Sequence, residues 1–508
     1  MGSVHRRRSF GLQEDEDLMA DTPAPSTVRV YAADEAFRAY ERERRLHWDA
    51  VARLPKGRGR WSVYYHRRLA DVCRLLVRPG LRVLEIGCGR GDLLASLRPR
   101  IGLGVDLSGE MVAAAAKKHP ELRFAQADAH FLPLAGEFDV VLLSDLLNDV
   151  WDVQRVLEEV RRVCHSRTRI LLTSYNRLWE PALGLADRLH MARPTLYQNW
   201  LTVEDLRNLL SLADLEFIRS WEEILWPLGT PVLARIANSI LVRFWPLRHL
   251  ALTHFLVARP TPASAVPSRP ASVSIVVPAR NEAGNIPELF RRLPRFGGGM
   301  ELVFVEGHSK DATYEVLVES IAREASWSCQ LIRQNGVGKG DAVREGFARA
   351  RGEILIILDA DLTVPPEDLP RYYEALVSGR AELANGVRLV YPMPGEAMRF
   401  FNLIGNKFFS LAFSWLLGQP VKDTLCGTKA LWKGDYEVIA ENRDYFGYAD
   451  PFGDFDLLLG AAKQNLKIVD IPVRYRSRVY GTTNISRWRH GALLLRMLLV
   501  AARRLKFT

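Results

Sequence analysis

Two aspartates one residue apart follow an apolar run in the second half of the chain. Residues 354–358 are unbroken in their apolar character, which is typical of a buried parallel strand, and Asp359 and Asp361 come directly after them. Ligands of open α/β sheets bind where such strands end. Two carboxylates at that point can share a hard divalent cation that also binds a diphosphate. The alternative interpretation is an ordinary strand followed by a solvated acidic turn.

Two more strand-like runs upstream change from apolar to polar residues at their carboxyl ends. The run VSIVVPARNE ends with Pro278, Arg280 and Glu282, and the run ELVFVEGHSKDAT becomes acidic at Glu306. Further on, NGVGKGDAVREG places Lys339 among glycines just before a helical pattern. Glycines permit close backbone approach, and a lysine at a helix start can bind phosphate oxygens. Strands that end in polar residues and alternate with helices predict a parallel nucleotide-binding sheet.

These motifs resemble those of a known family. PARNE, VEGHSKDAT, NGVGKGDAVREG and LDADL are similar, in order and spacing, to the inverting family-two glycosyltransferases of GT-A fold over about residues 272 to 490. The nearest resemblance is to dolichol- or polyprenyl-phosphate sugar transferases. It implies that Asp359 and Asp361 are catalytic and hold Mg²⁺ or Mn²⁺ on the donor diphosphate. The nucleotide-sugar contacts that we expect are Pro278, Arg280, Glu282, Glu306, Lys339 and Asp359.

This chain departs from the family at one of these motifs. The family often has two adjacent acids and a glycine where this chain has Glu306, Gly307 and His308. The departure leaves the nucleobase preference open.

The charge of the sugar acceptor decides which side chains the reaction needs. A hydroxyl acceptor needs a general base, whereas a phosphate is already ionised and needs a cationic site. By the same resemblance, FGDFDLLLGA supplies Asp454 and Asp456 as catalytic acids. The arginines that the resemblance assigns to acceptor or donor phosphates are Arg388, Arg399, Arg474 and Arg478. Each arginine has the alternative of being an ordinary solvated charge. The sequence GTTN puts Asn484 where the family commonly has a lysine.

Two apolar stretches of the second half indicate access to a membrane. In residues 396–418 polar side chains recur every three or four positions, and residues 490–507 are rich in leucine beside regularly spaced arginines. Neither stretch has the roughly 18 to 20 apolar residues that span a bilayer. Both suit helices that lie in the membrane interface. The alternative is that they are core helices or helices that contact a partner.

A different set of residues occupies the first half of the chain. In LRVLEIGCGRGDLL an apolar strand leads to Glu85 and then to glycines at 87, 89 and 91. Asp106 ends the next strand in GLGVDLSGEMV, and Asp128 follows in FAQADAHFLPL. A glycine loop lets the backbone approach a ligand, and an acid at the next strand end can accept hydrogen bonds from both hydroxyls of a ribose.

The glycine spacing, with an acid two residues before the first glycine, resembles the class I S-adenosylmethionine-dependent methyltransferases over about residues 60 to 258. The resemblance implies an S-adenosylmethionine site with contacts from Glu85, Gly87, Gly89, Gly91, Asp106, Asp128 and Ala129. No methyl acceptor follows from it, and the aromatic stretch 175–200 is the candidate for an acceptor lid. A domain of this fold that binds the cofactor without catalysis, in a membrane scaffold, is the alternative.

Composition divides the chain into four segments. Residues 1–45 mix charges and prolines and are expected to be a disordered or helical extension; residues 46–258 form the methyltransferase domain. Residues 259–271, rich in proline, alanine and serine, form a linker, and residues 272–508 form the GT-A domain with its interfacial helices. The expected fold class is therefore α/β in two domains, a Rossmann-like methyltransferase sheet followed by a GT-A nucleotide-sugar-binding sheet.

The formal net charge of +10 indicates an anionic partner. Basic clusters beside the leucine-rich helices favour an anionic lipid surface over nucleic acid, although an RNA-methylating first domain is a further alternative. The five cysteines form no Cys-x-x-Cys pair, and the start of the chain has no apolar signal-peptide core. We therefore expect a cytoplasmic protein, peripheral on the inner face of the membrane.

The chain is thus expected to be a bifunctional enzyme. The second half would transfer a sugar from a nucleotide donor to polyprenyl phosphate or another lipid-linked acceptor, and the first half would transfer a methyl group, both in one glycoconjugate pathway. A glycosyltransferase that acts on a hydroxyl acceptor is the main alternative.

Overall fold

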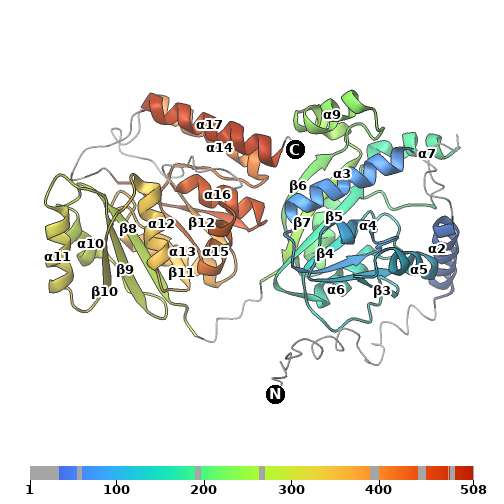
Figure 1. Cartoon of the computed structure of the whole chain (residues 1–508), viewed down its shortest axis with the longest axis horizontal. Helices are drawn as coiled ribbons and strands as arrows, with labels where there is room; N and C mark the ends of the chain where they lie inside the picture. The colour runs from blue at the N-terminus through green and yellow to red at the C-terminus, as the bar shows by residue number, and fades with distance from the viewer. Residues whose placement is uncertain are drawn as a thin grey trace, which may run out of the picture. The chain divides into compact units, whose positions relative to one another are not determined.

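The chain folds into two compact units that join between Thr261 and Pro262. Each unit has its own seven-stranded sheet with helices packed against it (Figure 1). The computed structural model describes residues 34–53, 60–188, 196–262, 269–388, 400–443, 453–476, 478, 480 and 487–506. The expected disorder at the start of the chain, and the middle of the expected linker, lie outside these residues.

The sheet of the first unit has the strand order β3-β2-β1-β4-β5-β7-β6. Five strands, from β3 to β5 in that order, are parallel, and β7 lies antiparallel between β5 and β6. The strands are β1 (Arg82–Ile86), β2 (Ile101–Asp106), β3 (Arg123–Gln126), β4 (Phe138–Ser144), β5 (Cys164–Tyr175), β6 (Leu215–Glu223) and β7 (Thr253–Pro260). The carboxyl ends of the parallel strands therefore meet at one edge of the sheet, where β1 and β2 deliver the predicted cofactor residues.

Several helices pack against this sheet by burying an apolar stripe. The helices and 3-10 turns are α2 (Glu35–Arg53), α3 (Arg60–Leu76), α4 (Asp92–Ser96), α5 (Gly109–Lys118), α6 (Val153–Arg162), η1 (Arg177–Trp179), α7 (Glu180–Arg188), α8 (Val203–Leu212), α9 (Pro231–Ser239), η2 (Leu241–Arg243) and η3 (Leu247–Leu250). In α6, for example, Val156, Leu157 and Val160 are buried at helical spacing. Helix α2 continues through residue 45, where the sequence placed a boundary, so the extension and the first domain share one helix.

The sheet of the second unit has the order β10-β9-β8-β11-β13-β12-β14. Strands β10, β9, β8 and β11 are parallel, as predicted for β9, β8 and β11. Strand β13 is antiparallel to β11 and β12, so the sheet is mixed. An apolar strand pattern does not encode the direction of its neighbour. The strands are β8 (Val273–Ala279), β9 (Met300–Glu306), β10 (Ser328–Arg333), β11 (Ile354–Ile357), β12 (Leu383–Val387), β13 (Lys429–Trp432) and β14 (Ile468–Pro472).

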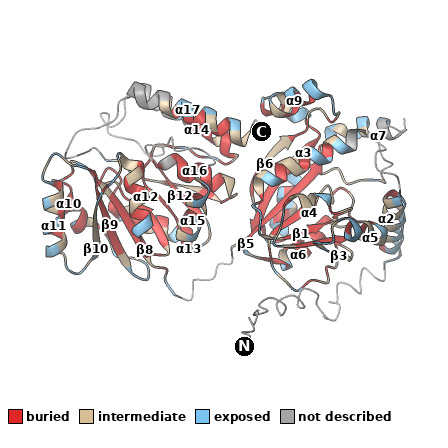
Figure 2. Ribbon diagram, viewed as in Figure 1, coloured by how far each residue is buried: buried red, intermediate tan, exposed pale blue. Residues whose placement is uncertain are grey.

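Strand β11 is buried on both of its faces. Its side chains alternate between two apolar cores, with Leu355 and Ile357 in one and Ile354, Ile356 and Leu358 in the other. Figure 2 shows the strands of this unit as mostly buried. Burial on both faces explains why the sequence has an unbroken apolar run at this point. The helices that enclose the two cores are α10 (Ile286–Arg292), α11 (Thr313–Arg323), α12 (Lys339–Arg349), η4 (Pro366–Asp368), α13 (Leu369–Val377), α14 (Phe400–Leu417), α15 (Lys433–Glu441), α16 (Asp454–Lys463) and α17 (Arg487–Leu505).

Helix α14 carries the predicted polar stripe, and two of its members face the protein. The hydroxyls of Ser410 and Ser414 donate hydrogen bonds to the Val421 carbonyl at 2.8 and 3.1 Å. The apolar side chains of Phe408 and Leu411 are exposed instead. Ser410 and Ser414 therefore hold the helix against the segment at Val421, and Phe408 and Leu411 form part of its outer surface.

Helix α17, which packs on α14, has a similar outer surface. Met497 and Leu498 are buried, whereas Leu495 and Leu499 are exposed beside the exposed Arg496. Among the described residues, no helix is both long enough and apolar enough to cross a bilayer.

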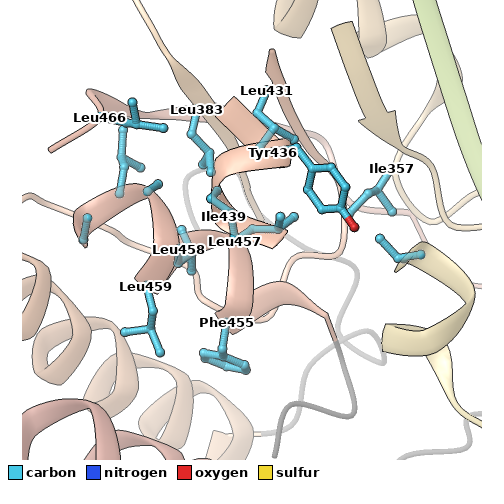
Figure 3. Close-up of a cluster of buried hydrophobic side chains, with 14 of the residues drawn as sticks. Ile357, Leu383, Leu431, Tyr436, Ile439, Phe455, Leu457, Leu458, Leu459 and Leu466 are labelled. Atoms are coloured by element: carbon cyan, nitrogen blue, oxygen red, sulfur yellow. The ribbon is translucent and has the colours of Figure 1, made fainter. Parts of the chain in front are cut away.

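Figure 3 shows the core between the sheet and helices α15 and α16, in which Phe455 packs among buried leucines. Phe455 has no exposed surface, and its ring centroid lies 5.0 Å from that of Phe413. We expect Phe455→Ala to lower the free energy of unfolding of the second unit by about 3 to 5 kcal/mol, because it leaves a cavity. Phe408→Ala, which removes an exposed ring, should change it by less than about 0.5 kcal/mol. Urea unfolding measures both, and equal effects would contradict this assignment of the core.

Candidate functional site

The two predicted aspartates lie just beyond the end of β11, each against a basic side chain. The Asp359 carboxylate is 2.6 Å from the Lys339 ammonium, and the Asp361 carboxylate is 2.6 Å from the Arg478 guanidinium. Asp361 also accepts hydrogen bonds from the backbone N–H and hydroxyl of Thr363, which fix its rotamer. Two carboxylates and two cations, from three separate parts of the sequence, therefore meet at the carboxyl edge of the sheet.

Lys339 reaches Asp359 because of the glycines around it. Gly338 precedes α12 with a φ of 95°, a conformation that favours glycine, and its carbonyl accepts a hydrogen bond from Gln334. Gly427, just before β13, packs directly on the ion pair. A Cβ there would lie 2.0 Å from the Lys339 ammonium and 2.3 Å from an Asp359 oxygen. Sequence reasoning missed Gly427, because no local pattern marks a glycine that a distant side chain requires.

Arg478 connects Asp361 to Glu282. Its guanidinium is 3.3 Å from the Glu282 carboxylate, which also accepts a 2.6 Å hydrogen bond from the Asn285 amide. Burial raises the pKa of Glu282 to about 7, and Arg478 opposes that shift. The predicted residue Glu282 is therefore part of the same charged group as Asp361.

The other predicted nucleotide contacts lie at the ends of β8 and β9. Pro278 pairs with Val305 across these strands, and Arg280 is exposed just after β8. Glu306 is buried, and its carboxylate accepts a 2.6 Å hydrogen bond from the Ser309 backbone N–H. These side chains share the sheet edge with the paired aspartates.

The predicted phosphate-binding arginines do not gather in one place. Arg478 is at the aspartates, but Arg388 forms a two-bond pair with the buried Asp423 at 2.7 and 2.9 Å. Arg474 is exposed after β14. Arg399 lies outside the described residues.

The late acidic motif opens α16. Gly453 abuts Gly340 of α12, which brings the start of α16 beside the helix that carries Lys339. Asp456 accepts a 2.9 Å hydrogen bond from Arg443 and lies 3.5 Å from Arg344. The side chain of Asp454 is outside the described set.

Asp359 and Asp361 supply some of the oxygen ligands that a divalent cation needs, and further ligands must come from elsewhere. The part of the chain that the structure describes contains no group of three or more His, Cys, Asp or Glu side chains placed to hold a metal. Asp359 and Asp361 offer hard oxygen donors, and each now balances its charge with a basic side chain. A cation that brings phosphate oxygens as further ligands suits this pair.

In the first unit, the glycine loop after β1 is shaped by left-handed backbone. Gly87, Gly89 and Gly91 have φ values of 75°, 51° and 71°. The Gly89 N–H donates a 2.8 Å hydrogen bond to Asp106, whose other oxygen accepts one from the Ser108 N–H at 2.9 Å. A Cβ on Gly89 would meet no atom within 4 Å, so the loop leaves open space beside it. This arrangement fits a ligand that approaches the loop backbone.

Glu85 lies beneath this loop and holds α4. Its carboxylate is buried and accepts a 3.0 Å hydrogen bond from the Leu94 N–H. Burial raises the pKa of Glu85 to about 8, and burial also raises the pKa of Asp106. Both acids accept hydrogen bonds from neutral backbone donors.

Asp128 pairs with a histidine that sequence reasoning missed. The His130 ring nitrogen Nδ1 is 2.5 Å from the Asp128 carboxylate, and Nε2 accepts a 3.1 Å hydrogen bond from the Asp152 N–H. A neutral ring therefore carries its proton on Nδ1 and donates it to Asp128. Ala129, between the two, is buried.

A second missed residue, Asp145, follows β4 at the same edge. It has a φ of 57°, and its carboxylate accepts hydrogen bonds from the hydroxyls of Tyr65 (2.8 Å), Thr173 (2.8 Å) and Tyr175 (3.3 Å). Burial raises its pKa. The next side chain, Leu146, packs beside Gly87, so Asp145 is adjacent to the glycine loop. Sequence reasoning missed Asp145 because, in the sequence, it is only one more polar residue after a strand, and its left-handed backbone cannot be seen there.

Helix α2 packs on the same edge. Asp49 accepts a 2.5 Å hydrogen bond from the Ser108 hydroxyl, and Arg90 of the glycine loop donates one to the Ala52 carbonyl at 2.8 Å. Trp48 donates a 2.7 Å hydrogen bond to the Asp149 carboxylate. The helix thus contacts the loops after β1, β2 and β4.

Two family models match the chain, one in each unit. The model described as "Methyltransferase domain" matches residues 83–167, which include the glycine loop, Asp106 and Asp145. The model described as "Glycosyl transferase family 2" matches residues 274–428, which include Lys339 and both aspartates of the pair.

Relatives of known description match the second unit. An undecaprenyl-phosphate 4-deoxy-4-formamido-L-arabinose transferase of Pseudomonas aeruginosa is 37% identical over 111 residues, which is 21% of this chain and 33% of the relative. A dolichol-phosphate mannosyltransferase of Pyrococcus furiosus is 29% identical over 220 residues, which is 42% of this chain and 59% of the relative. The chain therefore spans less than two thirds of the length of each of these relatives.

Solved structures resemble each unit weakly. Glucosyl-3-phosphoglycerate synthase of Mycobacterium tuberculosis is 18% identical, with a TM-score of 0.35, and covers 47% of this chain and 81% of its own. Magnesium protoporphyrin IX methyltransferase of Synechocystis PCC 6803 is 18% identical, with a TM-score of 0.30, and covers 47% of this chain and 100% of its own. Scores this low leave function undecided.

The chain therefore matches the family models of two transferase domain types, one in each unit. It joins a methyltransferase domain to a family-two glycosyltransferase domain, in that order along the sequence. The predicted fusion and the predicted fold class of two α/β domains are both confirmed.

The buried Glu85 predicts how the stability of the first unit depends on pH. Because its pKa is raised from 4.5 to about 8, the folded protein keeps a proton that the unfolded chain releases within that range. The free energy of unfolding should therefore fall as the pH rises from about 4.5 to about 8, by at most about 1.4 kcal/mol per pH unit from this residue. Glu85→Gln should remove that part of the pH dependence.

Urea unfolding of the first unit at several pH values within that range measures the effect. Glu121→Gln, a change at an exposed acid, serves as the control and should leave the slope unchanged. A variant at Glu85 that keeps the full slope would contradict the prediction.

Proposed function

We propose that the second unit transfers a sugar from a nucleotide donor to a polyprenyl phosphate, with inversion at the anomeric carbon. The observation that carries the proposal is the double pairing of Asp359 with Lys339 and of Asp361 with Arg478. Two carboxylates and two basic side chains in one place suit a ligand that brings a divalent cation together with phosphate oxygens. Once the carboxylates bind the cation, Lys339 and Arg478 are left to bind phosphates.

Asp359 and Asp361 would hold Mg²⁺ or Mn²⁺, which when bound neutralises the negative charge of the departing diphosphate. Lys339, at the start of α12, adds a cation and the positive end of the helix at the same place. Pro278, Arg280, Glu282 and Glu306 are proposed as contacts to the nucleoside, because they share this sheet edge.

A lipid-linked phosphate is the proposed acceptor. The matched relatives are named for undecaprenyl-phosphate and dolichol-phosphate transfer, and α14 and α17 expose apolar side chains outside the core. A phosphate acceptor is already ionised, so the reaction needs cationic side chains to bind it and no base to deprotonate it. We propose that these helices lie on the cytoplasmic face of the membrane, and that Arg388, Arg399 and Arg474 serve the acceptor or donor phosphates.

The contacts of Asp456 bear on the alternative of a hydroxyl acceptor. A general base must keep a free lone pair within reach of the hydroxyl. One oxygen of Asp456 accepts a hydrogen bond from Arg443 and also lies near Arg344. These contacts give Asp456 a structural role beside any role in proton removal. In this proposal Asp454 and Asp456 contribute to catalysis through their negative charge and not as a base.

For the first unit we propose methyl transfer from S-adenosylmethionine, which supplies an activated methyl group on a positively charged sulfur. Asp106 and Asp145 supply carboxylates at one sheet edge, and their hydrogen bonds come from neutral donors, while the buried Glu85 positions α4 beneath the glycine loop. Such an edge suits a cationic ligand. Gly87, Gly89, Gly91, Asp128 and Ala129 complete the proposed cofactor contacts. The methyl acceptor is proposed to be a sugar or lipid-linked product of the same glycoconjugate pathway.

The donor site predicts a selective loss of sugar transfer. Asp361→Asn removes one cation ligand, and we expect the rate of sugar transfer to fall roughly a hundredfold or more, because metal-based charge stabilisation is worth several kcal/mol. Asp368→Asn, a change at a partly exposed acid of η4, is the matched control and should retain the rate. The assay measures release of nucleoside diphosphate across a panel of sugar nucleotides, with a prenyl phosphate, a soluble glycan or no acceptor. Release that requires the soluble glycan would overturn the proposed acceptor.

The cofactor site predicts the reverse selectivity. Asp106→Ala removes the carboxylate that organises the glycine loop, and we expect affinity for S-adenosylmethionine to fall about tenfold to a hundredfold. Sugar transfer should persist, because the second unit has its own core. Asp71→Ala, at an exposed ion pair of α3, should leave affinity unchanged. Titration calorimetry measures binding, and a variant that silences both activities would contradict independent units.

A further inference from the structure

One surface of the first unit lies outside both candidate sites and is rich in apolar side chains. It is formed by α9, η2 and η3, which connect β6 to β7. The exposed side chains that define this α9–η3 surface are Val232, Leu233, Ile236, Ile240, Phe244 and Trp245. Trp245 is 75% exposed and Val232 is 71% exposed. Single exposed apolar residues are ordinary, but a contiguous group marks a place of interaction.

Helix α9 is turned the opposite way from an ordinary surface helix. Its buried side includes the small residues Ala234 and Ala237, whereas Val232, Ile236 and Ile240 recur every four residues on the exposed side (Figure 2). An ordinary surface helix buries its large apolar residues and exposes polar ones. The large apolar side chains of α9 are therefore placed to contact a binding partner outside the unit.

Buried hydrogen bonds hold α9 and η2 in this orientation. The Asn238 side chain accepts a 2.8 Å hydrogen bond from the Trp226 N–H, and it donates to the Trp226 carbonyl at 2.7 Å and to the Tyr64 hydroxyl at 2.9 Å. Arg243 of η2 pairs at 2.6 Å with the buried Glu223. Rotation of α9 to bury its apolar side would break these contacts and leave polar groups unpaired. The exposure is thus built into the fold.

The charge around the α9–η3 surface has one sign. Residues 224–281 contain no Asp or Glu, and residues 231–250 contain Arg235, Arg243, Arg248 and His249. Arg235 and His249 are exposed, whereas the neighbouring acid Glu223 is buried and neutralised by Arg243. Acids lie outside this segment, at the exposed Glu180 and at Asp187 of α7. Apolar and aromatic side chains beside cations without acids match a bilayer with anionic headgroups.

We propose that the α9–η3 surface docks the methyltransferase unit on an anionic lipid bilayer. Phe244 and Trp245 lie at the boundary between acyl chains and headgroups, where amphipathic aromatic rings are favoured. Arg235 and Arg248 bind headgroup phosphates. This surface belongs to a different unit from α14 and α17, and the proposal does not depend on sugar transfer.

The test is flotation of the full chain with vesicles of phosphatidylcholine alone or with added phosphatidylglycerol. The wild-type protein should float with the anionic vesicles. The double variant Phe244→Ser/Trp245→Ser should bind at least about tenfold more weakly, because two side chains lose their burial in lipid. Leu212→Ser, at an exposed leucine of α8, is the matched control and should bind like the wild type.

A conservative variant guards against loss of folding. Lipids with brominated acyl chains should quench part of the tryptophan fluorescence of the wild type, and Trp245→Phe should lose that part while still floating. Calorimetric binding of S-adenosylmethionine should be the same in all variants. Unchanged flotation of the double variant, or quenching that Trp245→Phe retains, would overturn the proposal.

Two further outcomes identify a different occupant. A wild-type dimer in analytical ultracentrifugation that the double variant abolishes would assign the surface to a second copy of the chain and overturn lipid docking. Failure of the wild type to float with any vesicle would also overturn it. Sugar transfer to a detergent-dispersed prenyl phosphate should be unchanged in the double variant, so failure of this proposal is distinguishable from failure of the proposed function.

Discussion

The constraint on which the second unit depends is the charge balance at the end of β11. A strand buried on both faces ends with two carboxylates that are partly shielded from water, and such charges need partners. Lys339 and Arg478 provide them. The glycine at 338 lets α12 begin where its lysine can reach Asp359, and the missing side chain at Gly427 leaves room for that lysine. The start of α12 and the glycine before β13 are thus both arranged around these ion pairs.

The first unit also has carboxylates at the end of its parallel strands, but their partners are neutral hydrogen-bond donors and not basic side chains. Its acids at the carboxyl edge accept hydrogen bonds from backbone N–H groups and hydroxyls, as at Asp106 and Asp145. Such donors satisfy the oxygens without cancelling their charge, so the edge remains suited to a cation. The proposed ligands of the two sheet edges differ accordingly, an anionic diphosphate in the second unit and a positively charged cofactor in the first.

The two units have separate cores, and we propose that both bind the same lipid bilayer. In the second unit, α14 and α17 expose apolar side chains outside the core, while in the first unit α9 does the same with arginines nearby. A shared bilayer would raise the effective concentration of a lipid-linked product near the other active site without any contact between the units. Covalent linkage adds to that effect.

Sequence by itself determined the features that local physics encodes. The unbroken run of β11, the glycine loop after β1 and the acids at strand ends follow from burial on both faces and from left-handed turns, which short stretches of sequence reveal. Three parallel strands of the second sheet followed in the same way, and the order of the two domains followed from the resemblance of their motifs to known families. The boundary predicted at residue 45 falls inside α2, which runs from Glu35 to Arg53.

Only the tertiary structure decided which distant residues meet. Arg478 reaches Asp361 across more than a hundred residues, and Asp145 and Gly427 became visible only when strands lay side by side. The antiparallel direction of β13 and the outward turn of α9 are of the same kind. Sequence periodicity reports whether a side chain is buried. It does not report which element buries it, because that choice rests on the sum of many weak contacts between remote segments.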